Sequence, residues 1–455
     1  SLSSKELRVP QVQVQPMSAE QVQHFLAAYL PTQADMIWKE LDGSPQFGIF
    51  QTPYFLKLLV DQVEATSEVP AGRASLFTGF VRQALQREIT GGHVLFLPDT
   101  LLTERDHRRL VNNQWRNPFD LPERGILLPS LSKLAFNMQQ DANTDSGQIR
   151  LDYDDACIIL AQDRDEDILK AGVALNVLDE DVTQQEILFF HQLLQEFFAA
   201  RALSQKPDPE LVRSPWQVHE VSPSLEEVME TLADSDPLPE LPQTGWEETT
   251  LLAAAMSAAP DAFMRDLMRT NLPLAARCTA APEVTISEAL KSEIQQALIA
   301  RSQDFANADL RARIAAGLAL GEVGDPRFER HSGPHGDYLL PPMVDIPAGS
   351  YPMGTDDNQY DDEKPAHTVE LAAFQIGKFP VTNAEYALFL AAGGYEDDQW
   401  WDTDEILAWL RGEGSTDGQK ETFRELWNTL QFWSDADIRG LVSQNLITSE
   451  QADSY

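Results

Sequence analysis

The side chain best placed for chemistry is His191, a histidine in a run of mainly apolar residues. Phe190 precedes it, and Leu193, Leu194 and Phe197 follow at helical spacing. An imidazole can donate a hydrogen bond to a phosphate oxygen in its neutral or its protonated form. The alternative is a core histidine on an apolar helix, with its ring bonded to the backbone. The residues alone leave both interpretations open.

Metal-binding patterns are weak throughout the chain. An acidic run can offer hard oxygens to Ca²⁺, but it lacks the spacing and the glycine of an EF-hand, so a solvated loop is favoured. The run comprises Asp356, Asp357, Asp361, Asp362 and Glu363. Cys157 and Cys278 fall in different predicted domains and are expected to be small buried hydrophobic residues rather than a disulfide or a zinc site. We predict no metal site and no catalytic residue.

A phosphate-binding loop of the form G-x-x-x-x-G-K-[ST] is absent from the 455 residues. Such a loop supplies the backbone N–H groups and the lysine that hold nucleotide phosphates. This chain alone is therefore not expected to hydrolyse ATP.

Helical periodicity dominates the first 330 residues, and the helices that it predicts must position His191. Ser18 and Gln21 form a capping-box pattern at the start of a first helix, and Pro53 fits the first turn of a later one. Helices and a strand between 93 and 203 predict a winged-helix-like module. Five short amphipathic helices between 204 and 330 predict HEAT-like repeats.

The pattern changes after His331. Residues 331–342 are interpreted as a linker. Short alternating segments from Met343 onward predict strands, and Thr382 is expected to begin a helix. An acidic tail follows, and its aromatic residues are expected to pack in a core. The alternative is that some of them form a partner-binding surface. Its tryptophans are Trp400, Trp401, Trp409, Trp427 and Trp433.

Two stretches in the helical part resemble the NACHT-type (STAND) NTPases, and a further one resembles a helical repeat. The segment TPYFLKLL at 52–59 looks like the helical subdomain that follows the nucleotide-binding core. The segment FHQLLQEFFAAR at 190–201 resembles the end of the winged-helix subdomain, and residues 310–327 are similar to a HEAT repeat.

The resemblance implies that Pro53 contacts the adenine face and that His191 contacts the β-phosphate of bound ADP, latching the winged helix. It implies ATP/ADP with Mg in the full-length parent, although no cofactor is assigned to this fragment alone. The partners would be an NTPase core upstream of Ser1, where the chain looks cut from a longer one, and further copies of the protein on activation. In bacteria, such architectures resemble antiviral defence proteins.

The third resemblance is to the formylglycine-generating-enzyme (sulfatase-modifying factor) domain, a fold related to C-type lectins. It rests on MVDIPAGS at 343–350, Met353-Gly354, PAHTV at 365–369 and VTN at 381–383. The missing second half would hold the copper-binding cysteine pair of the true oxidases, and no cysteine follows Cys278. A module that binds a protein or small ligand is therefore favoured. The alternatives are an oxidase domain on a helical scaffold and a non-enzymatic helical-repeat interaction protein.

Composition limits the partners. The chain has 34 basic and 72 acidic residues, a formal net charge of −38, so it should repel nucleic acid and anionic membranes. We identify no local basic patch in the sequence, and Arg73, Arg82 and Arg87 are expected to form a solvated helix face. No apolar run is long enough to span a membrane. The expected compartment is the cytoplasm.

The predicted fold is mainly α, followed by a partial α+β domain. The helical subdomain is 1–92, the winged-helix-like subdomain 93–203 and the HEAT-like repeats 204–330. The linker is 331–342, and the truncated formylglycine-generating-enzyme-like domain is 343–455. The predicted function is that of the regulatory and sensor half of a NACHT-type signalling ATPase.

Overall fold

The structure is a computed structural model, and it describes residues 15–42, 47–140, 150–161, 163–233, 236–356, 363–395 and 400–401. It divides into two compact units, Ser1–Asp325 and Pro326–Tyr455. The boundary lies close to residue 330, where the sequence predicts the helical part to end. The division of the first unit into three subdomains remains a prediction.

The first unit begins with helices that present the Pro53 segment. They are α2 (Ala19–Tyr29), α3 (Ala34–Leu41), α4 (Phe47–Phe50), α5 (Pro53–Thr66), α6 (Arg73–Thr90), the short 3-10 helix η1 (Val94–Phe96) and α7 (Glu104–Val111). The capping box at Ser18 is confirmed, because the Ser18 hydroxyl accepts from the Gln21 amide and the Gln21 side chain accepts from the Ser18 amide.

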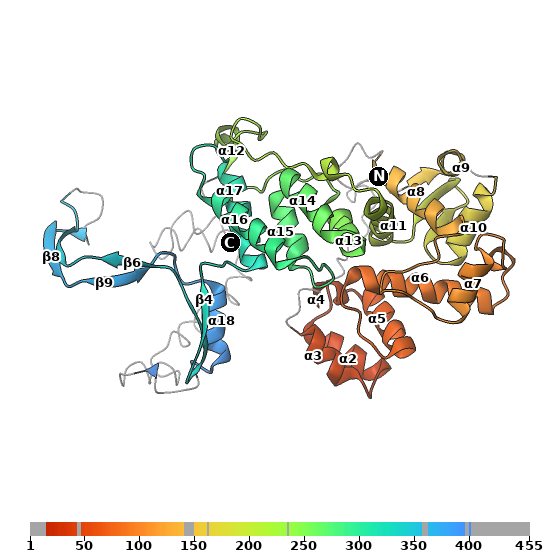
Figure 1. Cartoon of the computed structure of the whole chain (residues 1–455), viewed down its shortest axis with the longest axis horizontal. Helices are drawn as coiled ribbons and strands as arrows, with labels where there is room; N and C mark the ends of the chain where they lie inside the picture. The colour runs from red at the N-terminus through yellow and green to blue at the C-terminus, as the bar shows by residue number, and fades with distance from the viewer. Residues whose placement is uncertain are drawn as a thin grey trace, which may run out of the picture. The chain divides into compact units, whose positions relative to one another are not determined.

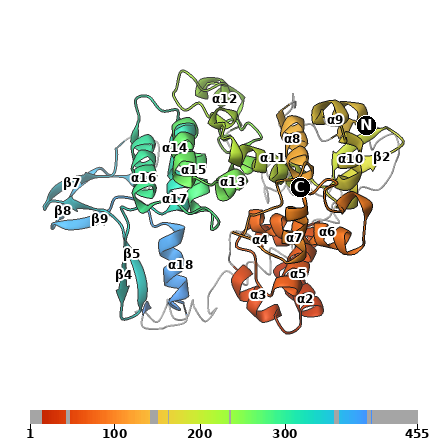
Figure 2. The same ribbon diagram turned by 45° about the vertical axis from the view of Figure 1, so that its right-hand side comes forward.

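A small antiparallel sheet follows, with helices around it. The elements are α8 (Leu127–Gln140), β1 (Arg150–Asp152), α9 (Tyr153–Leu160), α10 (Asp165–Ala174), β2 (Leu178–Asp181), β3 (Glu186–Phe189) and α11 (Gln192–Gln205). The strand order is β1-β3-β2, with Leu151 opposite Ile187. Helices α8, α9 and α10 lie beside one another in both views (Figures 1 and 2). This order is compatible with the winged-helix-like module, which remains a prediction.

The rest of the first unit is a group of short helices. They are η2 (Pro209–Val212), α12 (Leu225–Thr231), α13 (Glu247–Met256), α14 (Pro260–Thr270), α15 (Leu272–Ala280), α16 (Glu288–Gln303) and α17 (Leu310–Val323). The five helices from α13 to α17 are those that the apolar spacing predicts. Whether they are repeats of the HEAT type remains a prediction.

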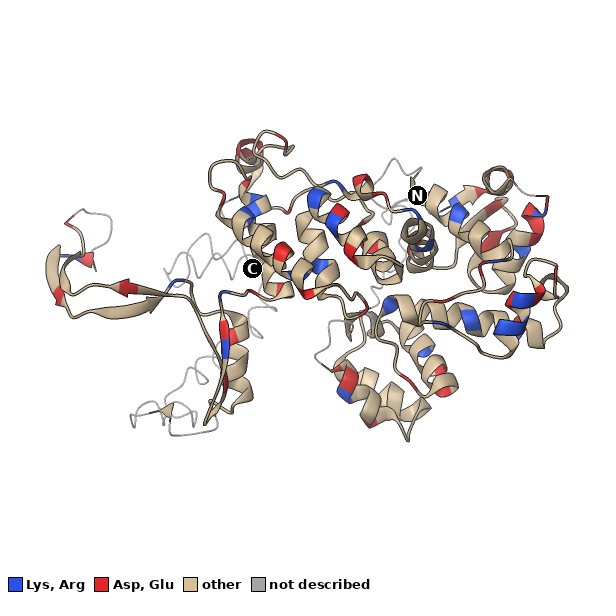
Figure 3. Ribbon diagram, in the orientation of Figure 1, with Lys and Arg blue, Asp and Glu red and all other residues tan. Residues whose placement is uncertain are grey.

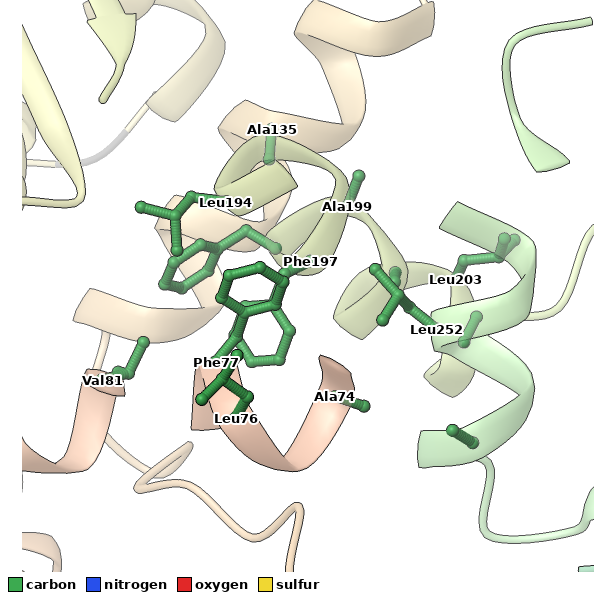
Figure 4. Packing of buried hydrophobic residues seen from close by; sticks show 14 of the residues in the cluster. Ala74, Leu76, Phe77, Val81, Ala135, Leu194, Phe197, Ala199, Leu203 and Leu252 are labelled. Carbon is green, nitrogen blue, oxygen red and sulfur yellow. The ribbon is translucent and has the colours of Figure 1, made fainter. Parts of the chain in front are cut away.

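The core of the first unit is continuous through its helices. Figure 4 shows Phe77 of α6 against Phe197 of α11, with Ala135 of α8 and Leu252 of α13 around them. The ring centroids of Phe77 and Phe197 lie 5.7 Å apart, and both side chains are fully buried. Because α11 contributes to this core, the orientation of His191 at its start is fixed by packing.

The second unit consists of three two-stranded ladders and one helix among the described residues. The elements are β4 (Glu329–Gly333), β5 (Gly336–Leu340), β6 (Met343–Ile346), β7 (Gly349–Met353), β8 (His367–Leu371), β9 (Phe374–Gly377) and α18 (Asn383–Ala391). The pairs are β4 with β5, β6 with β9 and β7 with β8, all antiparallel. The strands after Met343 and the helix capped by Thr382 agree with the sequence.

The stretch 331–342 is not a linker. It contributes most of the β4–β5 hairpin, in which Ser332 pairs with Asp337 and Gly333 with Gly336. Gly336 has a φ of 122°, which a residue with a side chain rarely adopts, and this allows the tight turn. No helix among the described residues is long and apolar enough to cross a membrane.

Candidate functional site

The two segments predicted to touch a nucleotide each begin a helix. Pro53 occupies the first turn of α5 and is exposed, with extended backbone at Thr52 before it. His191 is the N-cap of α11, with φ −150° and ψ 143°, so it is not inside an apolar helix as the sequence suggested. Its ring nitrogen Nδ1 accepts a hydrogen bond from the Leu193 amide at 3.1 Å. The histidine therefore satisfies one of the free amides of the first turn.

Aromatic contacts join the two helix starts. The Tyr54 ring is parallel to the His191 ring, with an angle of 5° and 5.8 Å between centroids. Phe55 meets the imidazole edge to face at 5.0 Å, and Phe190 lies 5.7 Å from Tyr54. The structure thus brings His191 against the two residues that follow Pro53.

The protonation state leaves one donor available on His191. Burial lowers the pKa of His191 below its ordinary value, which favours the neutral ring near pH 7. Because Nδ1 accepts from the backbone, the proton of the neutral ring is on Nε2. No described residue accepts a hydrogen bond from that nitrogen.

A second donor lies beside the first. The Tyr54 hydroxyl is buried and has no hydrogen-bond partner among the described residues. Burial also raises the pKa of Tyr54, so the hydroxyl keeps its proton. A buried hydroxyl without a partner costs free energy, so this position is energetically unfavourable for the fold.

The Nε2 donor of His191 fits one edge of a nucleotide site, but it does not form a complete one. A nucleotide with Mg²⁺ needs a phosphate cradle and carboxylate or hydroxyl ligands. The described part of the chain contains no group of three or more His, Cys, Asp or Glu side chains able to hold a metal. We therefore derive no chemical step through a nucleotide.

Arg73, Arg82 and Arg87 were expected to form a solvated helix face, and for Arg73 and Arg82 this expectation is wrong. Arg73 pairs with Glu248 of α13, which also pairs with Arg277. Arg82 donates to the backbone carbonyl of Asp120, and burial lowers its pKa to about 10. Arg87 donates to the carbonyl of Ala174. All three residues tie α6 to neighbouring elements, and only Arg87, whose side chain is 52% exposed, also lies on a solvated face as expected.

A small cavity lies in the second unit, between the turn of the β4–β5 hairpin and α18. Its volume is about 320 Å³, near the lower limit for small-molecule sites. His335 and Trp400 line it and meet edge to face, with 4.8 Å between centroids. Leu388 and Phe389 of α18 form an apolar wall, and Asp337 and Glu385 supply carboxylates.

The cavity depends on how α18 begins. Thr382 accepts from the Glu385 amide, and the Glu385 carboxylate accepts from the Thr382 amide, so the helix start is fixed by a capping box. Trp401 donates to the Gly394 carbonyl beyond the helix end. Sequence reasoning missed this cavity because it assigned the hairpin to a linker.

The expected metal-related residues give no metal centre in the described part of the chain. In the acidic run only Asp356 and Glu363 are described, and Asp356 accepts from the Ala366 amide. Both cysteines are free; Cys278 is buried and Cys157 partly so, as expected. Burial raises the pKa of Cys278 to about 12, which makes it an inert thiol. The described residues therefore do not fit a copper site.

Trp409, Trp427 and Trp433 lie outside the described residues.

Comparison with known proteins bears on the second unit. Residues 331–439 match the family model of the sulfatase-modifying factor enzyme 1-like domain. A hercynine oxygenase of Mycolicibacterium smegmatis is 42% identical over 89 residues, which is 19% of this chain and 20% of that protein. A formylglycine-generating enzyme of Mycobacterium tuberculosis is 46% identical over 57 residues, 12% of this chain and 19% of that protein. The bovine (Bos taurus) formylglycine-generating enzyme is 37% identical over 89 residues, 19% of this chain and 24% of that protein.

The chain therefore spans only about a fifth of the length of these curated relatives. No solved structure matches it. The expected resemblance of the C-terminal part to the formylglycine-generating-enzyme family is confirmed, and the match begins at His331, inside the stretch interpreted as a linker. The resemblance of the first unit to NACHT-type NTPases remains a prediction, as do the roles of Pro53 and His191.

Proposed function

We propose that this chain is a helical scaffold joined to the first part of a formylglycine-generating-enzyme-like domain, and that the complete domain oxidises its substrate. The observation that carries the proposal is the match of residues 331–439 to that family. The relatives are named for two activities, hercynine oxygenation and formylglycine generation. The substrate class is accordingly either a cysteine in a sulfatase-type protein or a small molecule of the hercynine kind. The helical unit would position this domain.

The experiment uses the parent protein with its complete domain. The purified protein is incubated aerobically with a sulfatase-type cysteine peptide and, separately, with hercynine and a thiol, and products are identified by mass spectrometry. We expect one of the two substrates to be oxidised. If neither changes while the two mycobacterial relatives turn over their own substrates in parallel, the domain is not an oxidase of these kinds. The binding-module alternative then takes its place, with the cavity at His335 and Trp400 as its candidate site.

A second candidate function is a nucleotide-controlled switch in the helical unit. The observation that favours it is the free donor His191 Nε2, which lies against the segment that follows Pro53. ADP held by a core upstream of residue 1 would place a phosphate against His191, and exchange for ATP would release α11 from α5. This function is compatible with the first one, because a switch can control an attached domain.

Nucleotide retention by the full-length parent tests the switch. Wild type and His191→Ala are purified and analysed for bound ADP. His93→Ala is a matched control, because His93 also caps a helix start with Nδ1, accepting from Leu95 at 3.3 Å. We expect His191→Ala to lose ADP and the control to keep it. A wild-type protein that carries no nucleotide would count against the switch.

A further inference from the structure

An arginine-lined cavity stands out on the first unit of this acidic protein. It has a volume of about 1020 Å³ and lies beside α7 and the segment that leads to α8. Five arginines line it: Arg105, Arg108, Arg109, Arg116 and Arg124. Figure 3 shows basic residues along much of α7, in contrast to the abundant acidic residues elsewhere. The expectation that the chain has no local basic patch is therefore wrong.

The positive charge of the cavity is only partly neutralised. Asp120 accepts from both Arg109 and Arg116. Glu123 is the acidic residue of the lining, and it pairs with the buried Arg201. Two carboxylates are thus already shared among several guanidinium groups.

Three arginines remain for a ligand. Arg105 and Arg124 have no ion pair or hydrogen bond to any described residue, and both are exposed. Arg108 meets only Glu104, at 3.8 Å, with both side chains about two-thirds exposed. Such a pair contributes little, so Arg108 is free to turn to an anion.

The floor of the cavity is held rigidly. The Asp120 side chain is only 4% exposed and fixes Arg109 and Arg116 from below. The Arg82 guanidinium lies over the Trp115 ring at 4.2 Å and donates to the carbonyls of Asn117 and Asp120. Binding therefore does not require this segment to be ordered first, which favours affinity.

We propose that this cavity binds a small polyphosphate ligand, one with at least two linked phosphate groups. Guanidinium groups bind phosphate oxygens in a bidentate manner, and arginine is the residue most suited to this contact. The side-chain amides of Asn112, Asn113 and Gln114 also line the cavity and add neutral donors. The amino acid types, the surplus charge and the volume agree on this ligand class.

The net charge of the chain favours binding of a small anion in this cavity over binding of a long polyanion. At physiological salt, charges act over about one Debye length, roughly 8–10 Å. A small polyphosphate inside the cavity therefore experiences the arginines, whereas a nucleic acid or an anionic membrane would also meet surfaces of a chain with net charge −38. The site differs from the one at His191, because none of its lining residues is Pro53, Tyr54 or His191.

The test is calorimetric titration of the 455-residue chain with inorganic tripolyphosphate. The variant is the double substitution Arg105→Ala/Arg124→Ala, and the control is Arg213→Ala/Arg269→Ala, which removes two exposed arginines outside the cavity. We expect the cavity variant to bind at least about tenfold more weakly, while the control stays close to wild type. Thermal unfolding should be unchanged in the cavity variant, because neither arginine has a partner to lose.

The result that overturns the proposal is wild-type protein that gives no binding heat, or a cavity variant that binds like wild type. Two competitors refine the test. A short single-stranded RNA or an acidic peptide that binds through the same arginines, when tripolyphosphate does not, would also overturn it, because the ligand class would be different.

Discussion

At the scale of single residues, Glu196 in α11 is a buried carboxylate whose ionisation is unfavourable for the folded state. The residue is 7% exposed, and one of its carboxylate oxygens has no hydrogen-bond partner among the described residues. Burial raises the pKa of Glu196 to about 7, the nearby Glu248 adds to the shift, and a hydrogen bond from Gln192 opposes it. A group whose folded pKa is raised above its unfolded value binds its proton more tightly when folded. The stability of the fold should therefore fall as pH rises from about 4.5 to about 7.

Replacing Glu196 with Gln should remove this dependence. We expect Glu196→Gln to stabilise the chain by about 2 kcal/mol at pH 8, because the ionised carboxylate is no longer buried. At pH 4.5 the variant and wild type should unfold alike, because Glu196 is then protonated in the folded state. Urea unfolding at both pH values measures the difference. Equal destabilisation at both would mean that Glu196 is buried for packing alone.

Asp120 makes the stability of the fold depend on pH in the opposite direction. Burial alone would raise the pKa of Asp120, but hydrogen bonds from Arg116 and the charge of Arg109 overcome this and lower it to about 2. Its contribution to stability is therefore complete above about pH 4 and lost as pH falls through about 2. We expect Asp120→Asn to cost about 2 kcal/mol at pH 7, because Arg109 loses its partner at a site 17% exposed. Acid unfolding should show the two proteins converging near pH 2.

At the scale of elements, the contact of α6 with α11 holds the first unit together. Phe77 and Phe197 are both fully buried, and Phe55 meets Phe77 from α5. We expect Phe197→Ala to destabilise the unit by about 3–5 kcal/mol through lost burial and the cavity left behind. Phe190→Ala is the matched control, because Phe190 is 50% exposed and should cost much less. Equal losses in urea unfolding would show that the core is not centred on this contact.

Elements with strong periodicity could be predicted from the sequence. The five helices from α13 to α17, the capping box at Ser18 and the helix start at Thr382 depend on local spacing, and all were found where expected. The β4–β5 hairpin was missed because its short strands contain glycine, serine and histidine, which are typical of loops. The contact of Arg82 with the Asp120 carbonyl joins residues 38 positions apart, and periodicity contains no such information.

The candidate sites were predictable to different degrees. The family resemblance implied that Pro53 and His191 contact one nucleotide, whereas the contact of His191 with the segment after Pro53 and its N-cap position were not foreseen. The arginine cavity did leave a local signal, since five arginines fall between residues 105 and 124 of an acidic chain. Averaging charge over the whole chain hid that signal.

At the scale of the whole molecule, the two units differ in how much apolar surface they bury. The hydrophobic core cluster runs from Val22 to Val323 and lies entirely in the first unit. In the described part of the second unit, α18 has no buried residue, and Phe374, Ile376 and Val381 are 43%, 53% and 76% exposed. Ordering a residue costs about 1–2 kcal/mol of backbone entropy, which burial must offset at roughly 25 cal/mol per Å².

Two fragments should therefore behave differently when they are produced separately. We expect residues 1–325 to unfold cooperatively in calorimetry, because the fragment contains the complete core cluster. We expect residues 326–455 to show no cooperative transition, because their described part lacks a core to offset the entropy of ordering. A sharp transition in residues 326–455 alone would place a core in residues outside the described ones and contradict the prediction.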